Sequence, residues 1–197
     1  MRERRYRQKM QETEQAWAVS AVDAAGAAHV KIRQYCKGQE EKMAIEVVRE
    51  YLKQWGAQQR ILEFPVSSAT VELAAQAVGC EPARIAKTLS FLVDDHAVLV
   101  VAAGDQKVDN GKYKAFFHTK AKMLSADQVT ELIGHAVGGV CPFGVKDGVE
   151  IYLDESLKRF ETVFPAAGSS NSAIEVTMEE LEQFSGSDKW VDVCKMK

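Results

Sequence analysis

The chain has 197 residues, of which 46% are hydrophobic and 27% charged, enough to build one folded domain with a buried core. The formal net charge of −3 excludes a protein that binds nucleic acid by bulk attraction, so any such contact needs a local basic patch. No apolar run reaches the roughly 20 residues of a membrane span, and none follows the basic first ten residues, so we expect a cytoplasmic protein with no secretory signal and no membrane partner.

The cysteines give no sign of a metal site or a disulfide framework. The four of them are widely scattered without a C-x-x-C pair, and the four histidines do not stand near them at zinc-ligand spacing. Reduced thiols and no metal are therefore predicted. The cysteines are Cys36, Cys80, Cys141 and Cys194.

Residues 1–42 differ in composition from the rest of the chain. They are crowded with Arg, Lys, Glu and Gln up to residue 15 and rich in Ala and Gly at residues 21–28. We interpret them as an N-terminal extension, disordered or loosely helical, in front of one domain at residues 43–197. The alternative is a tRNA-binding arm whose arginines meet phosphates, although acidic residues dilute its charge.

The first predicted elements of the domain are helices around a short strand. Apolar residues recur every three to four positions over residues 43–55, which predicts an amphipathic helix that stops at Gly56. A short strand is expected at residues 61–64. A helix is expected at residues 70–78, and Pro82 suits the first turn of another at residues 83–86.

Next in the chain comes a predicted β-hairpin. Two β-rich apolar runs, at residues 88–93 and 97–103, are joined by Asp94-Asp95-His96. Shorter strands are expected at residues 150–153, 162–164, 173–176 and 190–193.

Two capping boxes mark further helices. Ser125 with Gln128 begins one that ends before Gly134, and Thr177 with Glu180 begins one that ends near residue 184. Because helices and short strands mix without regular βαβ alternation, the predicted fold class is α+β. Neither G-x-G-x-x-G nor G-x-x-x-x-G-K-[ST] occurs, so the familiar nucleotide-binding loops are absent.

Lys87 is the first candidate functional residue, because it stands at the start of an apolar run. With a period of two it shares a face with Leu89, Phe91 and Val93, the expected core side. A buried ammonium is costly without a partner, so such a lysine either reaches an anion or extends to solvent. The alternative is that the strand begins after Lys87 and the side chain is solvated; spacing alone leaves both open.

Two turns of small residues are the next candidates. Residues 138–144, GGVCPFG, form a tight loop whose backbone N–H groups suit a carbonyl oxygen or an oxyanion. Residues 166–172, AAGSSNS, offer hydroxyl and amide groups. Each is also compatible with a purely structural turn. Cys141 raises the further alternative of a thiol nucleophile, with His135 near it in sequence but not demonstrably paired.

Residues 107–122 combine lysines with aromatic residues in an otherwise acidic protein. Lysines beside aromatic rings suit single-stranded nucleic acid, through phosphate contacts and base stacking. The alternative is a solvated helix face with its aromatic residues in the core. The lysines are Lys107, Lys112, Lys114, Lys120 and Lys122.

Taken together, four segments resemble the YbaK/EbsC family, which is related to the editing insertion domain of bacterial prolyl-tRNA synthetase. The resemblance covers about residues 43–194. Its carriers are RIAKTL at residues 84–89, GDQKVD at 104–109, the glycine-rich loop at 138–144 and AGSSNS at 167–172.

The resemblance implies a curved, mixed, barrel-like β-sheet surrounded by helices, with a pocket for the aminoacylated 3′ end of tRNA. It implies a hydrolase that cleaves the ester of mischarged aminoacyl-tRNA in trans by positioning, without a metal, a cofactor or a side-chain nucleophile. Lys87 would be the key polar group of the pocket, and the five lysines above would receive the acceptor stem. The substrate-binding residues would be Gly138, Gly139, Val140, Cys141, Pro142, Gly168, Ser169 and Asn171.

The resemblance leaves the substrate and the partners open. Some family members that act on cysteinyl-tRNA have an Asp where Ala173 aligns here, so Cys-tRNA(Pro), Ala-tRNA and other small aminoacyl esters all remain candidates. A pocket separates small apolar side chains by only about 1–3 kcal/mol per methylene. Docking on prolyl-tRNA synthetase is likewise open. The alternative function is a non-catalytic tRNA- or synthetase-binding module of the same fold.

Overall fold

The structure is a computed structural model that describes residues 43–197. The predicted extension at residues 1–42, and with it the alternative of a tRNA-binding arm, lies outside the described residues. Residues 43–52 are helical and continue into the 3-10 turn η1 (Lys53–Trp55). Gly56 ends this helix with φ 67°, in the left-handed region that glycine adopts readily, as predicted.

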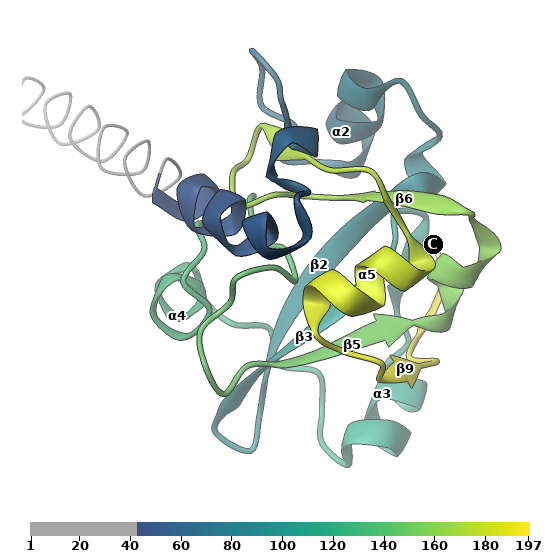
Figure 1. The fold of residues 1–197 in the computed structure, drawn as a ribbon. Helices are drawn as coiled ribbons and strands as arrows, with labels where there is room; N and C mark the ends of the chain where they lie inside the picture. Colours follow the sequence, from purple (N-terminus) through teal and green to yellow (C-terminus); the bar gives the residue numbers. More distant parts are fainter. Residues whose placement is uncertain (1–42) are drawn as a thin grey trace, which may run out of the picture. The chain divides into compact units, whose positions relative to one another are not determined.

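A curled, mixed sheet of six strands forms the centre of the described domain (Figure 1). Its strand order is β8-β6-β2-β3-β5-β9. β2 and β3 are antiparallel, whereas β6 runs parallel to β2 and β5 runs parallel to β3. This sheet, with helices around it, confirms the predicted α+β class. The strands are β2 (Ile85–Val93), β3 (His96–Ala103), β5 (Glu150–Asp154), β6 (Thr162–Pro165), β8 (Val176–Thr177) and β9 (Trp190–Val191).

The hairpin of β2 and β3 confirms the prediction with a tighter turn than expected. Only Asp94 and Asp95 form the turn, with φ of 44° and 68°, and His96 already pairs with Val93. Positive φ at both central residues is typical of the two-residue turn that matches the twist of paired strands, and aspartate tolerates it better than most residues.

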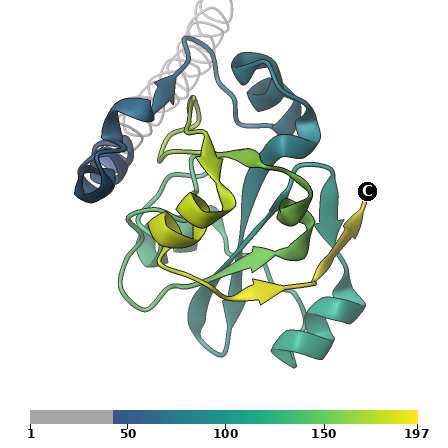
Figure 2. The ribbon, with the colours of Figure 1, turned by 45° about the vertical axis from the view of Figure 1, so that its right-hand side comes forward.

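Two short antiparallel ribbons flank the sheet. β1 (Leu62–Glu63) pairs with β7 (Ser172–Ala173), and β4 (Gln106–Val108) pairs with β10 (Cys194–Met196). Figure 2 shows the C-terminal strand beside β4. The strand predicted at residues 173–176 is therefore divided between β7 and β8. Of the strand predicted at residues 190–193, only Trp190 and Val191 belong to a strand, β9.

The helices cover both faces of the sheet. Leu181 and Phe184 of α5 pack in a core cluster with Leu99 and Val101, while Tyr113 of α3 packs in a second cluster with alternate residues of β3. β3 is thus buried on both faces. The helices are α2 (Val71–Val78), α3 (Asn110–Phe117), α4 (Ala126–Leu132) and α5 (Met178–Ser185); α4 and α5 begin at the two predicted capping boxes.

The helix predicted at residues 83–86 is wrong. Only the 3-10 turn η3 (Pro82–Arg84) forms, and Ile85 and Ala86 belong to β2, where they pair with Phe164 and Pro165 of β6. Pairing with a strand distant in sequence overrides the local helix signal. β2 therefore begins before Lys87, which excludes the alternative that the strand starts after this residue.

Candidate active site

The site lies along an edge of β2 that is only partly paired. β2 pairs with β3 along its length, but with β6 only at Ile85 and Ala86. Further along, the Leu124 N–H donates to Ser90 O at 3.1 Å and the Leu92 N–H donates to Lys122 O at 2.9 Å. Because outward-facing main-chain groups recur every second residue, the N–H and C=O of Thr88 point into the gap between these contacts. No described segment pairs with them there.

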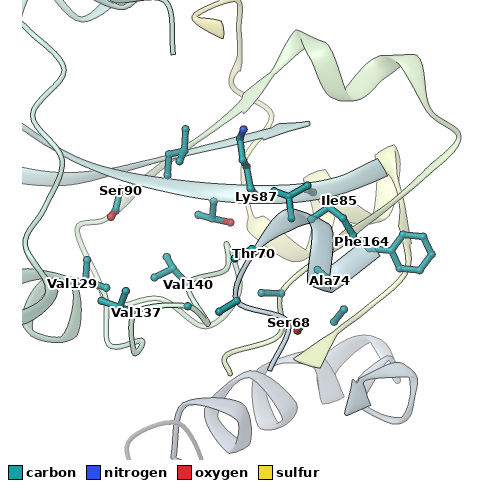
Figure 3. Close-up of a pocket in the computed structure, with 18 of the residues that line it drawn as sticks. Ser68, Thr70, Ala74, Ile85, Lys87, Ser90, Val129, Val137, Val140 and Phe164 are labelled. Carbon is teal, nitrogen blue, oxygen red and sulfur yellow. The ribbon is translucent and has the colours of Figure 1, made fainter. Parts of the chain in front are cut away.

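A cavity of about 540 Å³ opens at this gap (Figure 3). It borders residues of both faces of β2, from Ile85 to Ser90. The buried hydroxyl oxygen of Thr88, which is among them, has no hydrogen-bond partner among the described residues. The other walls come from residues 68–74 at the start of α2, Met123 to Val129 around the start of α4, the bend at Val137 to Val140, Phe164, Ala166, Ser172 and Ala173, and the C-terminal Lys197.

Lys87 is half-buried, and its ammonium is held by main-chain carbonyls. The side chain lies on the β2 face that carries Phe91 and Val93, and its Nζ donates to Gly104 O at 3.2 Å and to Gln106 O. Burial lowers the pKa of this amine, and the nearby Lys197 lowers it further. Figure 3 shows the ammonium projecting from β2 away from Val137 and Val140. The cavity therefore borders Lys87 and the glycine-rich bend, but the two stand on different sides of the strand.

The glycine-rich bend places only part of its residues on the cavity. Gly138, with φ 99°, and Val140 line it. Gly139 packs instead on the neighbouring turn, where a Cβ would approach Ser169 Cα to 2.6 Å. Cys141 and Pro142 are buried in the core.

The structure brings Cys141 and His135 together, but as a buried neutral pair. The Cys141 N–H donates to His135 Nδ1 at 3.4 Å, and the thiol lies 3.8 Å from the same nitrogen. Burial raises the pKa of the Cys141 thiol to about 12 and lowers the pKa of His135 to about 4. A fully buried thiol that resists ionisation is a poor nucleophile, so this pair does not support a thiol enzyme.

The turn after β6 is hydrogen-bonded to the segment that precedes α2. Asn171 donates through its side chain to Phe64 O at 2.8 Å, and the Ser68 N–H donates to Ser170 O at 2.6 Å. The buried Ser169 hydroxyl donates to the Ser172 hydroxyl at 2.8 Å, and Gly168 packs closely on Ala44. Of this turn, Ser172 and Ala173 reach the cavity, whereas Gly168, Ser169 and Asn171 hold the wall in place.

The lysines of residues 107–122 have different surroundings. Lys112 is occupied by Asp192, at 2.6 Å, and by Cys194 O. The other four are exposed and form no ion pair with the residues that the structure describes. Lys122 directly precedes Met123 of the cavity wall, and Tyr113 is in the core. The exposed lysines are Lys107, Lys114, Lys120 and Lys122.

Several residues of this site were not found by sequence reasoning. Thr88 follows the candidate Lys87 directly, but its importance depends on the missing strand partner, which no local pattern reveals. Asp105 belongs to the motif at residues 104–109. This motif is the sequence feature that could have indicated the turn whose carbonyls bind the Lys87 ammonium. Within residues 43–197, no group of three or more His, Cys, Asp or Glu side chains is placed to hold a metal ion. The helices of this part of the chain are too short or too polar to cross a bilayer.

Comparison with known proteins identifies relatives of the whole domain. The model of the aminoacyl-tRNA editing domain family matches residues 66–184. An uncharacterised Bacillus subtilis protein, YwhH, is 54% identical over 154 residues, which cover 78% of this chain and 98% of YwhH. The crystal structure of a candidate trans-editing enzyme for prolyl tRNA synthetase superposes with a TM-score of 0.71 at 31% identity, covering 77% of this chain and 97% of that one.

Proline–tRNA ligases are also among the relatives, through a segment of their chains. The ligase of Bacillus velezensis is 31% identical over 90 residues, which cover 45% of this chain and 16% of the ligase. The family match spans more than half of the described domain and includes the β2 edge, the glycine-rich bend and the wall at Ser172 and Ala173. The chain belongs to the aminoacyl-tRNA editing domain family, and its role is in aminoacyl-tRNA editing.

Proposed function

We propose that this protein is a trans-acting hydrolase that cleaves the ester between a small amino acid and the 3′ end of a mischarged tRNA, with Cys-tRNA(Pro) and Ala-tRNA(Pro) as the first candidates. The observation that carries the proposal is the cavity at the gap in the β2 edge, where main-chain groups of Thr88 face open space. Family membership supports it, because the matched family edits aminoacyl-tRNA.

The size and lining of the cavity suit the end of a tRNA. At about 540 Å³ it falls within the range of small-molecule sites, so it suits a terminal nucleoside with a small amino acid rather than a helical stem. Its side-chain walls are mostly small or aliphatic, with Ala173 among them. A small, uncharged amino acid is therefore the expected substrate.

The chemistry needs donors and acceptors rather than a nucleophilic side chain. A water attacks the ester carbonyl, the bond to the ribose oxygen breaks, and the ribose hydroxyl and the free amino acid leave. The outward N–H of Thr88 suits the developing oxyanion, and its C=O and hydroxyl suit the substrate ammonium or a ribose hydroxyl. Lys87, which borders the same cavity, supplies positive charge for the phosphate of the terminal nucleotide.

A panel of mischarged tRNAs tests this function. The purified protein is incubated with Cys-, Ala- and Ser-tRNA(Pro) and with correctly charged Pro-tRNA(Pro), and free amino acid and tRNA binding are both measured. We expect release from at least one small mischarged species and little from Pro-tRNA(Pro).

The same panel separates the rival function. A non-catalytic module of this fold binds the tRNA, or prolyl-tRNA synthetase, and leaves every ester intact. Binding without release across the panel would therefore contradict the proposed hydrolase and favour the binding module.

A further inference from the structure

The Lys87 ammonium depends on a single turn for its acceptors. Gly104 O, at 3.2 Å, and Gln106 O both accept from Nζ, and these carbonyls stand on either side of Asp105 in the turn between β3 and β4. A half-buried ammonium keeps its charge and its direction only while such acceptors stay in place. The geometry of this turn therefore sets where the charge of Lys87 lies.

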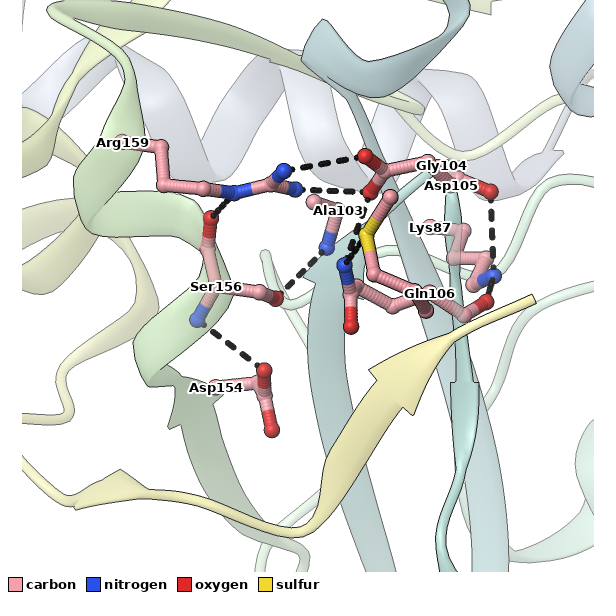
Figure 4. A network of polar contacts seen from close by, with 9 residues as sticks. Lys87, Ala103, Gly104, Asp105, Gln106, Asp154, Ser156 and Arg159 are labelled. Atoms are coloured by element: carbon pink, nitrogen blue, oxygen red, sulfur yellow. Dashed lines mark hydrogen bonds and ion pairs between the residues drawn. The ribbon is translucent and has the colours of Figure 1, made fainter.

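An ion pair fixes the turn from outside the strand. Arg159 donates to Asp105 through both terminal nitrogens, at 2.6 and 2.9 Å, and its Nε donates to Ser156 O at 2.8 Å (Figure 4). Two parallel bonds between a guanidinium and a carboxylate define direction as well as distance. Gln106 adds a bond from its side-chain amide to Asp105 Oδ1, at 3.1 Å.

The arginine is itself held on a short, anchored element. η4 (Glu155–Arg159) begins at the buried Asp154, which accepts from the Ser156 N–H at 3.0 Å and from the Val193 N–H at 3.1 Å. The Ser156 hydroxyl accepts from the Ala103 N–H at 3.3 Å, so η4 also touches the end of β3.

On its other side the turn has no room to move. Gly104 lies so close to η3 that a Cβ would stand 2.0 Å from Pro82 O. The turn is therefore held between η3 and the Asp105–Arg159 pair, and this pair, unlike Gly104, can be altered by a substitution that adds no bulk.

We infer that Asp105 and Arg159 are positioning residues of the editing site, which orient the Lys87 ammonium by fixing the two carbonyls that bind it. This inference rests on the proposed function in so far as Lys87 serves the hydrolysis. Neither residue lines the cavity, so neither touches the substrate in this arrangement.

The charges around Lys87 predict the direction in which its pKa changes when Asp105 is replaced. Asp105, Glu72 of α2 and the Cys194 thiol raise the pKa of Lys87, whereas burial and Lys197 lower it. Replacing Asp105 by the neutral, equally shaped asparagine removes one of the raising charges and leaves the Arg159 cation unpaired. The pKa of Lys87 should then fall, and activity that needs the charged amine should be lost at a lower pH than in the wild type.

The test combines kinetics with an NMR titration of the Lys87 amine in the full chain. Asp105→Asn should lower kcat for deacylation by about tenfold with little change in KM, and should shift the alkaline limb of the pH profile and the Lys87 titration to lower pH. Glu155→Gln is the matched control, because it removes an exposed carboxylate of η4, the element that carries Arg159; this carboxylate pairs with Lys158 at 2.8 Å. It should leave kcat, KM, the pH profile and the Lys87 titration at wild-type values.

Arg159→Lys is the second variant. It keeps the positive charge but cannot form the two parallel hydrogen bonds of the guanidinium to Asp105. It should lower kcat less than Asp105→Asn does and leave the Lys87 titration near that of the wild type. If Asp105→Asn does not fold, this variant tests the inference in its place. Wild-type kinetics and titration in both variants would overturn the inference while leaving the hydrolase intact. A shifted titration in a protein that releases no amino acid would support the positioning pair and overturn the proposed function.

Discussion

Lys87 occupies a place where a lysine is costly unless main-chain oxygens surround its charge. The carbonyls of Gly104 and Gln106 meet that need, and burial still holds the pKa of the amine below its usual value. Sequence spacing left open whether this side chain faces the core or solvent, and it gave no sign of the acceptors. Those come from a turn 17 and 19 residues further along the chain, brought back by the hairpin.

His135 gives a second residue-scale prediction, on stability. Its pKa is lowered to about 4 by burial, so the folded state resists a proton that the unfolded chain accepts near pH 6.5. Stability is therefore fully present above about pH 6.5 and falls as the pH drops toward 4, by about 3 kcal/mol in total. Urea unfolding at a series of pH values measures this loss.

The matched variant for this titration is His135→Asn. Its side-chain oxygen can still accept from the Cys141 N–H, but the group has no proton to gain in this range. We expect the variant to be less stable at neutral pH and to show a flatter dependence between pH 6.5 and 4. An equally steep dependence in the variant would assign the loss to other groups.

At the scale of elements, the segment around α3 carries the positive charge expected to meet tRNA. Lys112 pairs with Asp192, whereas Lys120 and Lys122 are exposed close to the cavity wall at Met123. Charge reversal at Lys120 and Lys122 should raise KM for aminoacyl-tRNA, and should reduce the number of counterions released on binding by about two. The salt dependence of KM measures this.

Control substitutions at Lys53 and Lys158 separate position from net charge. Both are exposed and already pair with glutamates within their own helical segments. Reversing them changes the total charge equally, and we expect the slope with salt to stay near that of the wild type. If both double variants lose the same part of the salt dependence of KM, Lys120 and Lys122 do not contact tRNA more than other surface lysines do.

Elements marked by local chemistry could be predicted from the sequence. The helix that ends at Gly56, the two capping boxes and the hairpin at Asp94-Asp95 each depend on residues that are neighbours in the chain. The helix expected at residues 83–86 was wrong because pairing with β6 decides the structure of Ile85 and Ala86. Likewise, β7 ends at Ala173 and β9 ends at Val191 because their pairing with strands distant in sequence ends there.

At the scale of the whole molecule, the site is a property of the sheet rather than of any motif. The gap exists because β6 leaves β2 after Ala86 and the segment at residues 122–124 joins it only near Ser90. Residues from six parts of the chain then line the cavity, β2 and Lys197 among them. Motifs at Lys87, at Gly138 and at residues 166–172 pointed to three of its walls. Thr88, Met123 and Val137 become wall residues only once the strands are paired.

The central claim is that this cavity hydrolyses a small aminoacyl ester with the help of Lys87. Single-turnover release of labelled amino acid from the best substrate of the panel, by the wild type and by Lys87→Ala, tests it most directly, with circular dichroism to show that the variant folds. We expect the wild type to exceed the uncatalysed rate clearly and the variant to lose at least about 100-fold. Equal rates for the two folded proteins would contradict the account.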